Sequence, residues 1–130
     1  MNYLRIITLY IIVVLILNLI PTSSGDGIAL SSREIFFIRA DYLLHLILFV
    51  PLMVLVWLYM NKENITGVTR FNHALLWLAA GIIFAALLEV IHLFLPHRSF
   101  NPVDLILNVS GVILGALVFL WDPKRYAKLE

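Results

Sequence analysis

Hydrophobic side chains dominate four long stretches of the sequence, at about residues 3–20, 42–60, 75–95 and 103–121, and most polar residues fall between or at the ends of these stretches. An α-helix rises 1.5 Å per residue, so roughly 20 apolar residues cross the ~30 Å hydrocarbon core of a bilayer. Each stretch has about this length. The pattern therefore predicts an all-α fold, a four-helix transmembrane bundle that forms a single domain over residues 1–130.

Composition narrows the class of protein further. Hydrophobic residues make up 62% of the 130 residues and charged residues 13%, and the mean hydropathy is +1.00. These values exclude an ordinary soluble domain and a disordered chain. The absence of cysteine excludes disulfides and thiolate metal ligands, and a net charge of +1 without a dense basic stretch gives no indication of nucleic-acid binding.

The first apolar stretch has two interpretations. Arg5, the apolar residues after it and the polar segment 21–25 together resemble a cleavable signal peptide. The stretch is, however, longer than most signal-peptide cores, and no Ala-x-Ala cleavage site follows it. We therefore expect a retained first transmembrane helix.

The distribution of lysine and arginine predicts the orientation. One side of the predicted bundle carries Arg5, Lys62, Arg70, Lys124, Arg125 and Lys128, and the other carries Arg33, Arg39 and Arg98. The positive-inside rule then places both termini and the 61–72 loop in the cytoplasm. In the outer loop, Ser31-x-x-Glu34 is a capping-box pattern followed by the apolar residues 35–38, which predicts a short helix in the outer interface.

Polar residues at the outer ends of the last three stretches form the candidate site. Ionisable and amide side chains are costly in a bilayer, so a group of them at one depth indicates a functional site. The group consists of Asp41, His45, Glu89, His92, Arg98, Asp104 and Asn108.

Helical spacing aligns these residues in pairs, and structural roles compete with functional ones. Asp41 and His45 are four residues apart, as are Asp104 and Asn108, while Glu89 and His92 are three apart, so each pair shares a helix face. Glu89 has Arg98 as a charge partner, Asp41 is a candidate helix cap, and the segment 101–104 has the Asn-Pro-x-Asp pattern of a helix start. A structural role and a functional role are therefore both compatible with each of these residues.

Metal binding has little support in the sequence. Glu89-x-x-His92 has the spacing of carboxylate-bridged metal bundles, but such sites need a second copy, and the chain has none. A single divalent ion held by some of the acidic and histidine residues is compatible with the sequence. We assign no metal, and any cofactor is unknown.

Small residues indicate where helices approach closely. Gly111-x-x-x-Gly115 permits close packing, and Gly81-x-x-x-Ala85 on the third stretch is a candidate counterpart. Asn108 lies on the same stripe as the two glycines of the fourth stretch and is expected to hydrogen-bond between helices.

The motifs resemble those of VanZ-like membrane proteins. Asp41-x-x-x-His45 is similar to the signature of the family's second helix. The blocks Glu89-x-x-His92-x-x-x-Pro96-x-Arg98 and Asp104-x-x-x-Asn108-x-x-Gly111 are similar to the family's later helices. The similarity extends from about residue 40 to residue 115. Two positions depart from the family pattern, since Tyr42 replaces a usual Lys and His92 a usual Gln.

The resemblance implies a multi-pass protein of the bacterial cytoplasmic membrane, associated with the cell envelope and with resistance to teicoplanin-type glycopeptide antibiotics. Our leading hypothesis is that it binds an anionic amphiphile or a lipid-linked molecule in an outward-facing polar pocket. Arg98 would meet the anionic group, while Glu89, His45 and His92 would accept hydrogen bonds.

Two other functions compete with this hypothesis. One is a membrane enzyme that acts on a lipid phosphate or a lipid-linked envelope intermediate, with Asp41, His45 and Glu89 as candidate catalytic residues. The other is a helper that assembles a larger envelope complex as a homo- or hetero-oligomer. In that role the polar residues would act only through folding.

Overall fold

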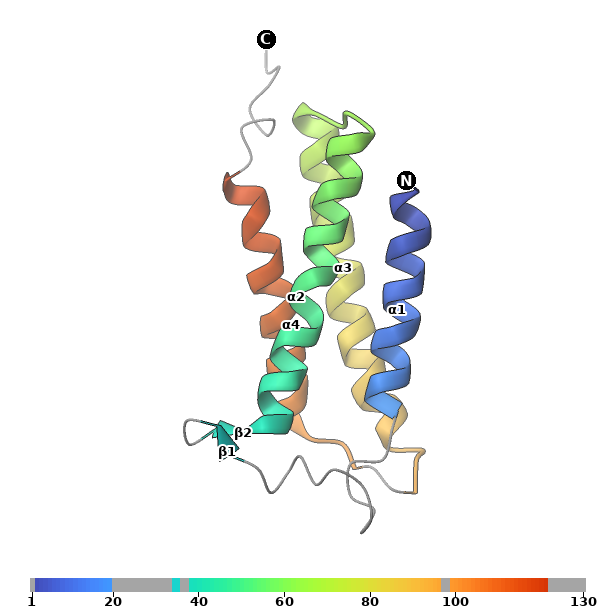
Figure 1. Cartoon of the computed structure of the whole chain (residues 1–130), viewed down its shortest axis with the longest axis vertical. Coiled ribbons are helices and arrows are strands. Elements are labelled where there is room, and N and C mark those ends of the chain that lie inside the picture. Colours follow the sequence, from blue (N-terminus) through green and yellow to red (C-terminus); the bar gives the residue numbers. More distant parts are fainter. Residues whose placement is uncertain (1, 20–33, 36–37, 97–98, 122–130) are drawn as a thin grey trace.

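The computed structural model describes residues 2–19, 34–35, 38–96 and 99–121. Side chains are described for residues 2–19, 42–96 and 99–121. Four helices run side by side along the long axis of the molecule (Figure 1). The elements in chain order are α1 (Tyr3–Leu19), β1 (Glu34–Ile35), β2 (Ile38–Arg39), α2 (Ala40–Lys62), α3 (Gly67–His92), α4 (Pro102–Ala116) and the short 3₁₀ helix η2 (Leu117–Trp121).

The all-α fold is confirmed, and its helices indicate a membrane-embedded protein. In the part of the chain that the structure describes, three segments are long and apolar enough to span a bilayer, at Tyr42–Lys62, Gly67–His92 and Pro102–Trp121. Helix α1 is apolar but has only 17 residues, which corresponds to about 25 Å. That α1 also crosses the membrane, and that both termini are cytoplasmic, stay predictions.

The predicted start of the third helix is wrong, because α3 begins at Gly67 and not near residue 75. The turn after α2 has the hydrogen bonds of a Schellman motif: the Ile65 amide donates to the Met60 carbonyl at 3.0 Å, and the Asn64 amide to the Asn61 carbonyl at 3.3 Å. Asn64 adopts the left-handed conformation that this motif requires, with φ of 51°. The connection between α2 and α3 is therefore short, and the polar residues after it, such as Arg70 and His73, already belong to α3.

The left-handed backbone at Asn64 gives a testable effect on stability. Asn64→Val is expected to lower the free energy of unfolding by about 1–2 kcal/mol, because a β-branched side chain is strained at positive φ. Asn64→Gly should be neutral or slightly stabilising, since glycine accepts this conformation. Unfolding midpoints of the two variants in detergent check the prediction, and equal midpoints would contradict it.

The predicted short helix around residues 34–38 is also wrong. Strands β1 and β2 pair antiparallel, with Glu34 opposite Arg39 and Ile35 opposite Ile38. Isoleucine, being β-branched, favours strands, and this preference outweighs the capping-box pattern here. The other residues of the predicted helix, 31–33 and 36–37, lie outside the described residues.

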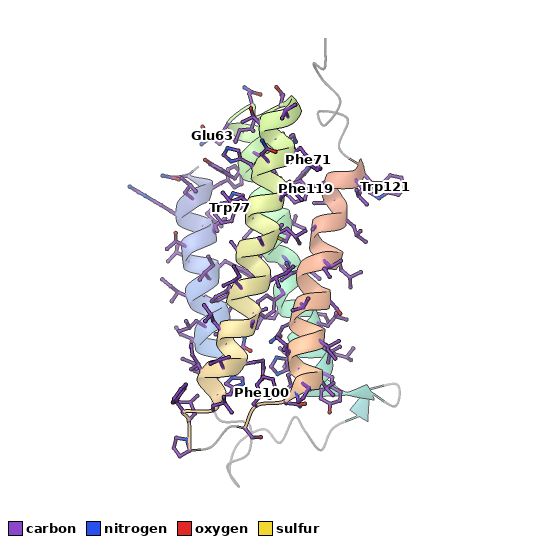
Figure 2. All side chains as sticks on the ribbon, turned by 180° about the vertical axis from the view of Figure 1, so that it is seen from behind. Glu63, Phe71, Trp77, Phe100, Phe119 and Trp121 are labelled. Carbon is purple, nitrogen blue, oxygen red and sulfur yellow. The ribbon has the colours of Figure 1, made fainter. Side chains whose placement is uncertain are left out.

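The core of the bundle lies along α2. Phe49 and Met53 of α2 pack with buried residues of all three other helices, and Leu52, Val56 and Met60 form a second buried cluster with Ile7 of α1. Many large apolar side chains point outward instead, as the stick view shows (Figure 2). Such a surface would be a liability in water, whereas in a bilayer it is the expected contact with lipid.

The small residues of α4 pack on α2, so the predicted pairing with Gly81-x-x-x-Ala85 is wrong. A methyl group built on Gly111 would overlap the backbone carbonyl of Leu46, and one on Gly115 would overlap that of Val50. Gly81 of α3 faces the Val112 side chain instead. The backbones of α2 and α4 are thus in direct contact, which fixes how the polar residues of these two helices face each other.

Candidate functional site

Buried polar side chains gather at one end of the bundle, where α1 and α3 end and α2 and α4 begin (Figure 1). Each of them is at most 8% exposed, and Glu89 and Asn108 are fully buried. The buried residues at this end are Asn18, His45, Glu89, His92, Asp104 and Asn108. They form two groups, one between α2 and α4 and one between α1 and α3.

The first group joins α2 to α4 through His45. Its Nδ1 lies 3.0 Å from Oδ1 of Asn108, so the imidazole donates to the amide oxygen in this arrangement. Its Nε2 lies 3.7 Å from Oδ2 of Asp104, which is an electrostatic contact too long for a good hydrogen bond. The close approach of Gly111 to α2, one turn further along α4, holds His45 and Asn108 at this separation.

The second group joins α3 to the end of α1 through His92. The imidazole Nε2 donates to the backbone carbonyl of Asn18 at 3.1 Å, and Nδ1 lies 3.3 Å from Oε2 of Glu89, three residues earlier on the same helix. The backbone amide of Asn101, just before α4, donates to the same Glu89 oxygen at 3.3 Å. Glu89 and His92 therefore connect three segments of the chain.

The partner of His92 at Nε2 assigns one hydrogen of the imidazole. This partner is a carbonyl, so Nε2 carries a hydrogen. On its other side the imidazole contacts the Glu89 carboxyl, and both side chains are buried, at 0–1% exposure. Removing either member would therefore leave the other as a buried polar group without this partner.

Four buried polar atoms at this end have no hydrogen-bond partner among the described residues. They are Oδ1 of Asn18, Oε1 of Glu89, Oδ1 of Asp104 and Nδ2 of Asn108. An unsatisfied buried polar atom costs about 1–3 kcal/mol, and lipid tails offer no partner. Within the described part of the chain, these three acceptors and one donor are therefore available to water or to a polar ligand.

Five of the seven residues predicted for the site are brought together in these two groups: His45, Asp104 and Asn108 in one, Glu89 and His92 in the other. Asp41 lies in the first turn of α2, but its side chain is outside the described part. Arg98 lies outside the described residues altogether. Asn101 caps α4, since its Oδ1 accepts from the Val103 amide at 3.0 Å, and Pro102 follows at the first helical position, as predicted.

Metal binding gains no geometric support from the described side chains. No three His, Asp or Glu side chains among them come close enough to hold an ion. The ring nitrogens of His45 instead contact the Asn108 amide oxygen and the Asp104 carboxylate. Those of His92 contact the Asn18 carbonyl and the Glu89 carboxyl.

Sequence reasoning missed two buried residues. Asn18 contributes its backbone carbonyl to His92, and its own amide nitrogen donates to Val14 of the same helix at 2.8 Å. A single Asn after a long apolar run of this helix was the available signal. Arg70, assigned to a loop, is 2% exposed and donates to the Ile65 carbonyl and to Oδ1 of Asn61, so it holds the α2–α3 turn at the other end of the bundle.

Comparison with known proteins agrees with the motifs. The model of the family described as VanZ/LLP1 matches residues 4–122, nearly the whole chain. No match was found among curated proteins, and none among solved structures. The matched range includes the six buried polar residues at the end of the bundle where α2 and α4 begin.

Proposed function

The chain belongs to the VanZ/LLP1 family, and from this premise we propose that it binds an anionic amphiphile or a lipid-linked envelope molecule at the buried polar end of the bundle. The protein acts as a multi-pass component of the bacterial cytoplasmic membrane. By binding this envelope molecule, the protein contributes to resistance to teicoplanin-type glycopeptides.

The observation that carries this proposal is the set of unpartnered buried atoms. Within the described part of the chain, Glu89, Asp104 and Asn18 each leave an acceptor oxygen without a donor, and Asn108 leaves an N–H without an acceptor. A ligand rich in amide, hydroxyl or ammonium groups supplies the missing donors, and its carbonyl or phosphate oxygens take the Asn108 donor. Envelope precursors with sugar and peptide headgroups have this chemistry.

Charge and surface support an amphiphilic ligand facing outward. Three cations of the described residues, Arg5, Lys62 and Arg70, lie at the opposite end of the bundle, which the positive-inside rule places in the cytoplasm. Arg98, which lies between α3 and α4 in the sequence, would supply the cation for the anionic group. The outer faces of the helices are apolar, so an acyl tail rests against them in the lipid.

Native mass spectrometry of the purified protein tests the proposal. Wild type is expected to retain an anionic amphiphile, and Arg98→Ala to retain about tenfold less, because the charge-assisted contact is lost. Arg5→Ala is the matched control, since it removes an exposed arginine from the other end of the bundle and should leave retention of the ligand that Arg98→Ala loses unchanged. Equal retention by wild type and Arg98→Ala would contradict the proposal.

A further inference from the structure

The two oxygens of the Glu89 carboxyl group differ in their contacts. Oε2 lies 3.3 Å from Nδ1 of His92 and accepts from the Asn101 amide at 3.3 Å. Oε1 is buried and has no hydrogen-bond partner among the residues that the structure describes. The carboxyl group is therefore held in place through Oε2, and Oε1 stays available as an acceptor.

The side chain of Asn18 is a second acceptor beside the same histidine. The backbone carbonyl of Asn18 lies 3.1 Å from Nε2 of His92, which brings the end of α1 next to α3. The side-chain nitrogen of Asn18 donates to the Val14 carbonyl at 2.8 Å, and this contact orients the amide. Its Oδ1 is buried and, in the described part of the molecule, lacks a donor. His92 thus lies between two residues that each keep an available acceptor oxygen.

The available atoms beside His92 favour one kind of ligand group. Both atoms are acceptors, so the group that meets them must bring N–H or O–H donors. A primary ammonium group has three N–H donors and no acceptor, whereas a hydroxyl group or water also brings lone pairs that need donors of their own. Ammonium also donates to a carboxylate through a charge-assisted hydrogen bond, which is about twice as strong as one between neutral groups.

The described basic side chains do not supply this donor. The lysine and arginine side chains that the structure describes lie at the other end of the bundle, near the start of α1 and the α2–α3 turn (Figure 1). Of the two imidazoles at the polar end, His92 faces Oε2 of Glu89, and His45 contacts Asp104 and Asn108. The donor for Oε1 of Glu89 therefore comes from outside the described part of the chain, and the bound amphiphile is a source of it.

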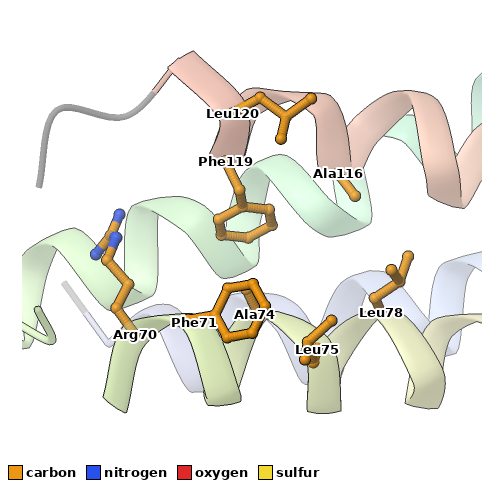
Figure 3. A pocket seen from close by; sticks show the side chains of 8 residues that line it. All are labelled: Arg70, Phe71, Ala74, Leu75, Leu78, Ala116, Phe119 and Leu120. Carbon is orange, nitrogen blue, oxygen red and sulfur yellow. The ribbon is translucent and has the colours of Figure 1, made fainter. Parts of the chain in front are cut away.

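The apolar pocket at the opposite end of the bundle does not compete for an ammonium group. It lies between α3 and the α4–η2 segment, and its lining combines Arg70 with apolar side chains such as Phe71, Leu78 and Phe119 (Figure 3). The arginine side chain has only donors, and its charge repels a second cation. Preferential retention of a lipid that carries ammonium N–H groups therefore reports on the polar end.

We propose, on the basis of the function proposed above, that the bound amphiphile carries a primary amine beside its anionic group and that Oε1 of Glu89 accepts from the ammonium. Asn18 Oδ1 accepts from a further donor of the same headgroup. Arg98 keeps its proposed role toward the anionic group. The ligand class is thereby narrowed from any anionic amphiphile to one with both charges, such as an amine-bearing phospholipid or a lipid-linked peptide with a free amine.

The test uses protein reconstituted in an equal mixture of phosphatidylethanolamine and phosphatidylcholine, followed by native mass spectrometry. The two headgroups carry the same charges, but only phosphatidylethanolamine has ammonium N–H donors. Wild type is expected to retain phosphatidylethanolamine over phosphatidylcholine by about tenfold. Glu89→Gln keeps the size of the side chain, removes the carboxylate and should abolish most of this preference. Glu63→Gln, the same change at an exposed acid at the end opposite to Phe100 (Figure 2), should match wild type.

A palmitoylated peptide with one lysine, added to the same membranes, distinguishes the two sources of the amine. If the peptide displaces phosphatidylethanolamine, the site accepts peptide amines, and if it does not, the site takes the phospholipid headgroup. Either result supports the proposal, provided that wild type prefers the lipid with N–H donors.

Three results would overturn this proposal. The first is equal retention of the two phospholipids by wild type, which needs no variant to be folded. The second is an unchanged preference in Glu89→Gln, whose folding circular dichroism verifies. The third is a preference that appears only in Arg98→Ala, since Arg98 would then be the donor that Glu89 meets in the intact protein.

Failure of this proposal is separate from failure of the proposed function. Arg98→Ala is expected to lower the retention of both phospholipids and to leave their ratio unchanged, because both carry a phosphate. Equal retention of the two phospholipids by wild type, with loss of both in Arg98→Ala, would contradict the amine site alone. A preference that depends on Glu89, with total retention unaffected by Arg98→Ala, would support the amine site and contradict the role of Arg98 in the proposed function.

Discussion

Gly111→Ala is expected to lower the free energy of unfolding by about 3 kcal/mol, the upper part of the range for overpacked sites. The added methyl group overlaps the Leu46 carbonyl, and a backbone group cannot move aside without moving the whole of α2. Because His45 and Asn108 face each other across the same pair of helices, their hydrogen bond should lengthen as the helices separate. Denaturation in sodium dodecyl sulfate, followed by circular dichroism, measures the change in stability.

Gly81→Ala provides a matched control on α3. There the added methyl group would lie 2.9 Å from Cγ1 of Val112, which is a side-chain atom rather than a backbone carbonyl, so the clash is smaller than at Gly111. The gain in helix propensity from glycine to alanine, about 1 kcal/mol, offsets part of that strain. Equal stabilities of the Gly111 and Gly81 variants would refute direct backbone contact between α2 and α4.

His92→Leu is expected to cost about 3–5 kcal/mol, the range for removing one partner of a buried pair. Among the described residues, the variant leaves Glu89 with the Asn101 amide as its one hydrogen-bond partner, and the Asn18 carbonyl loses the His92 donor at the end of α1. His92→Gln should cost less, because an amide N–H replaces one of the two lost hydrogen bonds. Denaturation curves of the two variants measure the difference.

The double variant Glu89→Leu/His92→Leu separates packing from function. Replacing both members of a buried polar pair by apolar residues is often neutral or stabilising, so the double variant is expected to be more stable than His92→Leu alone. A double variant less stable than His92→Leu would show that the Glu89 carboxyl holds the bundle together without its histidine partner.

The sequence predicted the fold because a bilayer requires long apolar runs, and those runs are readable without tertiary information. It misplaced the start of α3 because Arg70 and His73 are as polar as loop residues, yet near a membrane surface a helix carries polar side chains freely. The boundary is set by the left-handed Asn64, which no periodicity reveals. The glycine pattern of α4 was evident, but which helix faces it depends on packing between distant segments.

The candidate site was predictable in part for the same reason. Buried polar residues such as Glu89 and Asn108 stand out in apolar runs, and the structure groups them as spacing suggested. The role of Asn18 was not predictable, because it contributes a backbone carbonyl to a residue 74 positions away. The participation of Asp41 and Arg98 stays a prediction.

The most direct test of ligand binding at the polar end is to compare the amphiphile retained by wild type and by the folded Glu89→Leu/His92→Leu variant, using native mass spectrometry. The variant removes both members of the pair together, although the Asn18 carbonyl and the Asn101 amide lose a partner, and circular dichroism verifies that the variant is folded before its ligand is measured. We expect the variant to keep its helices and to lose the amphiphile of the polar end. A folded variant that retains this amphiphile as wild type does would contradict the proposal.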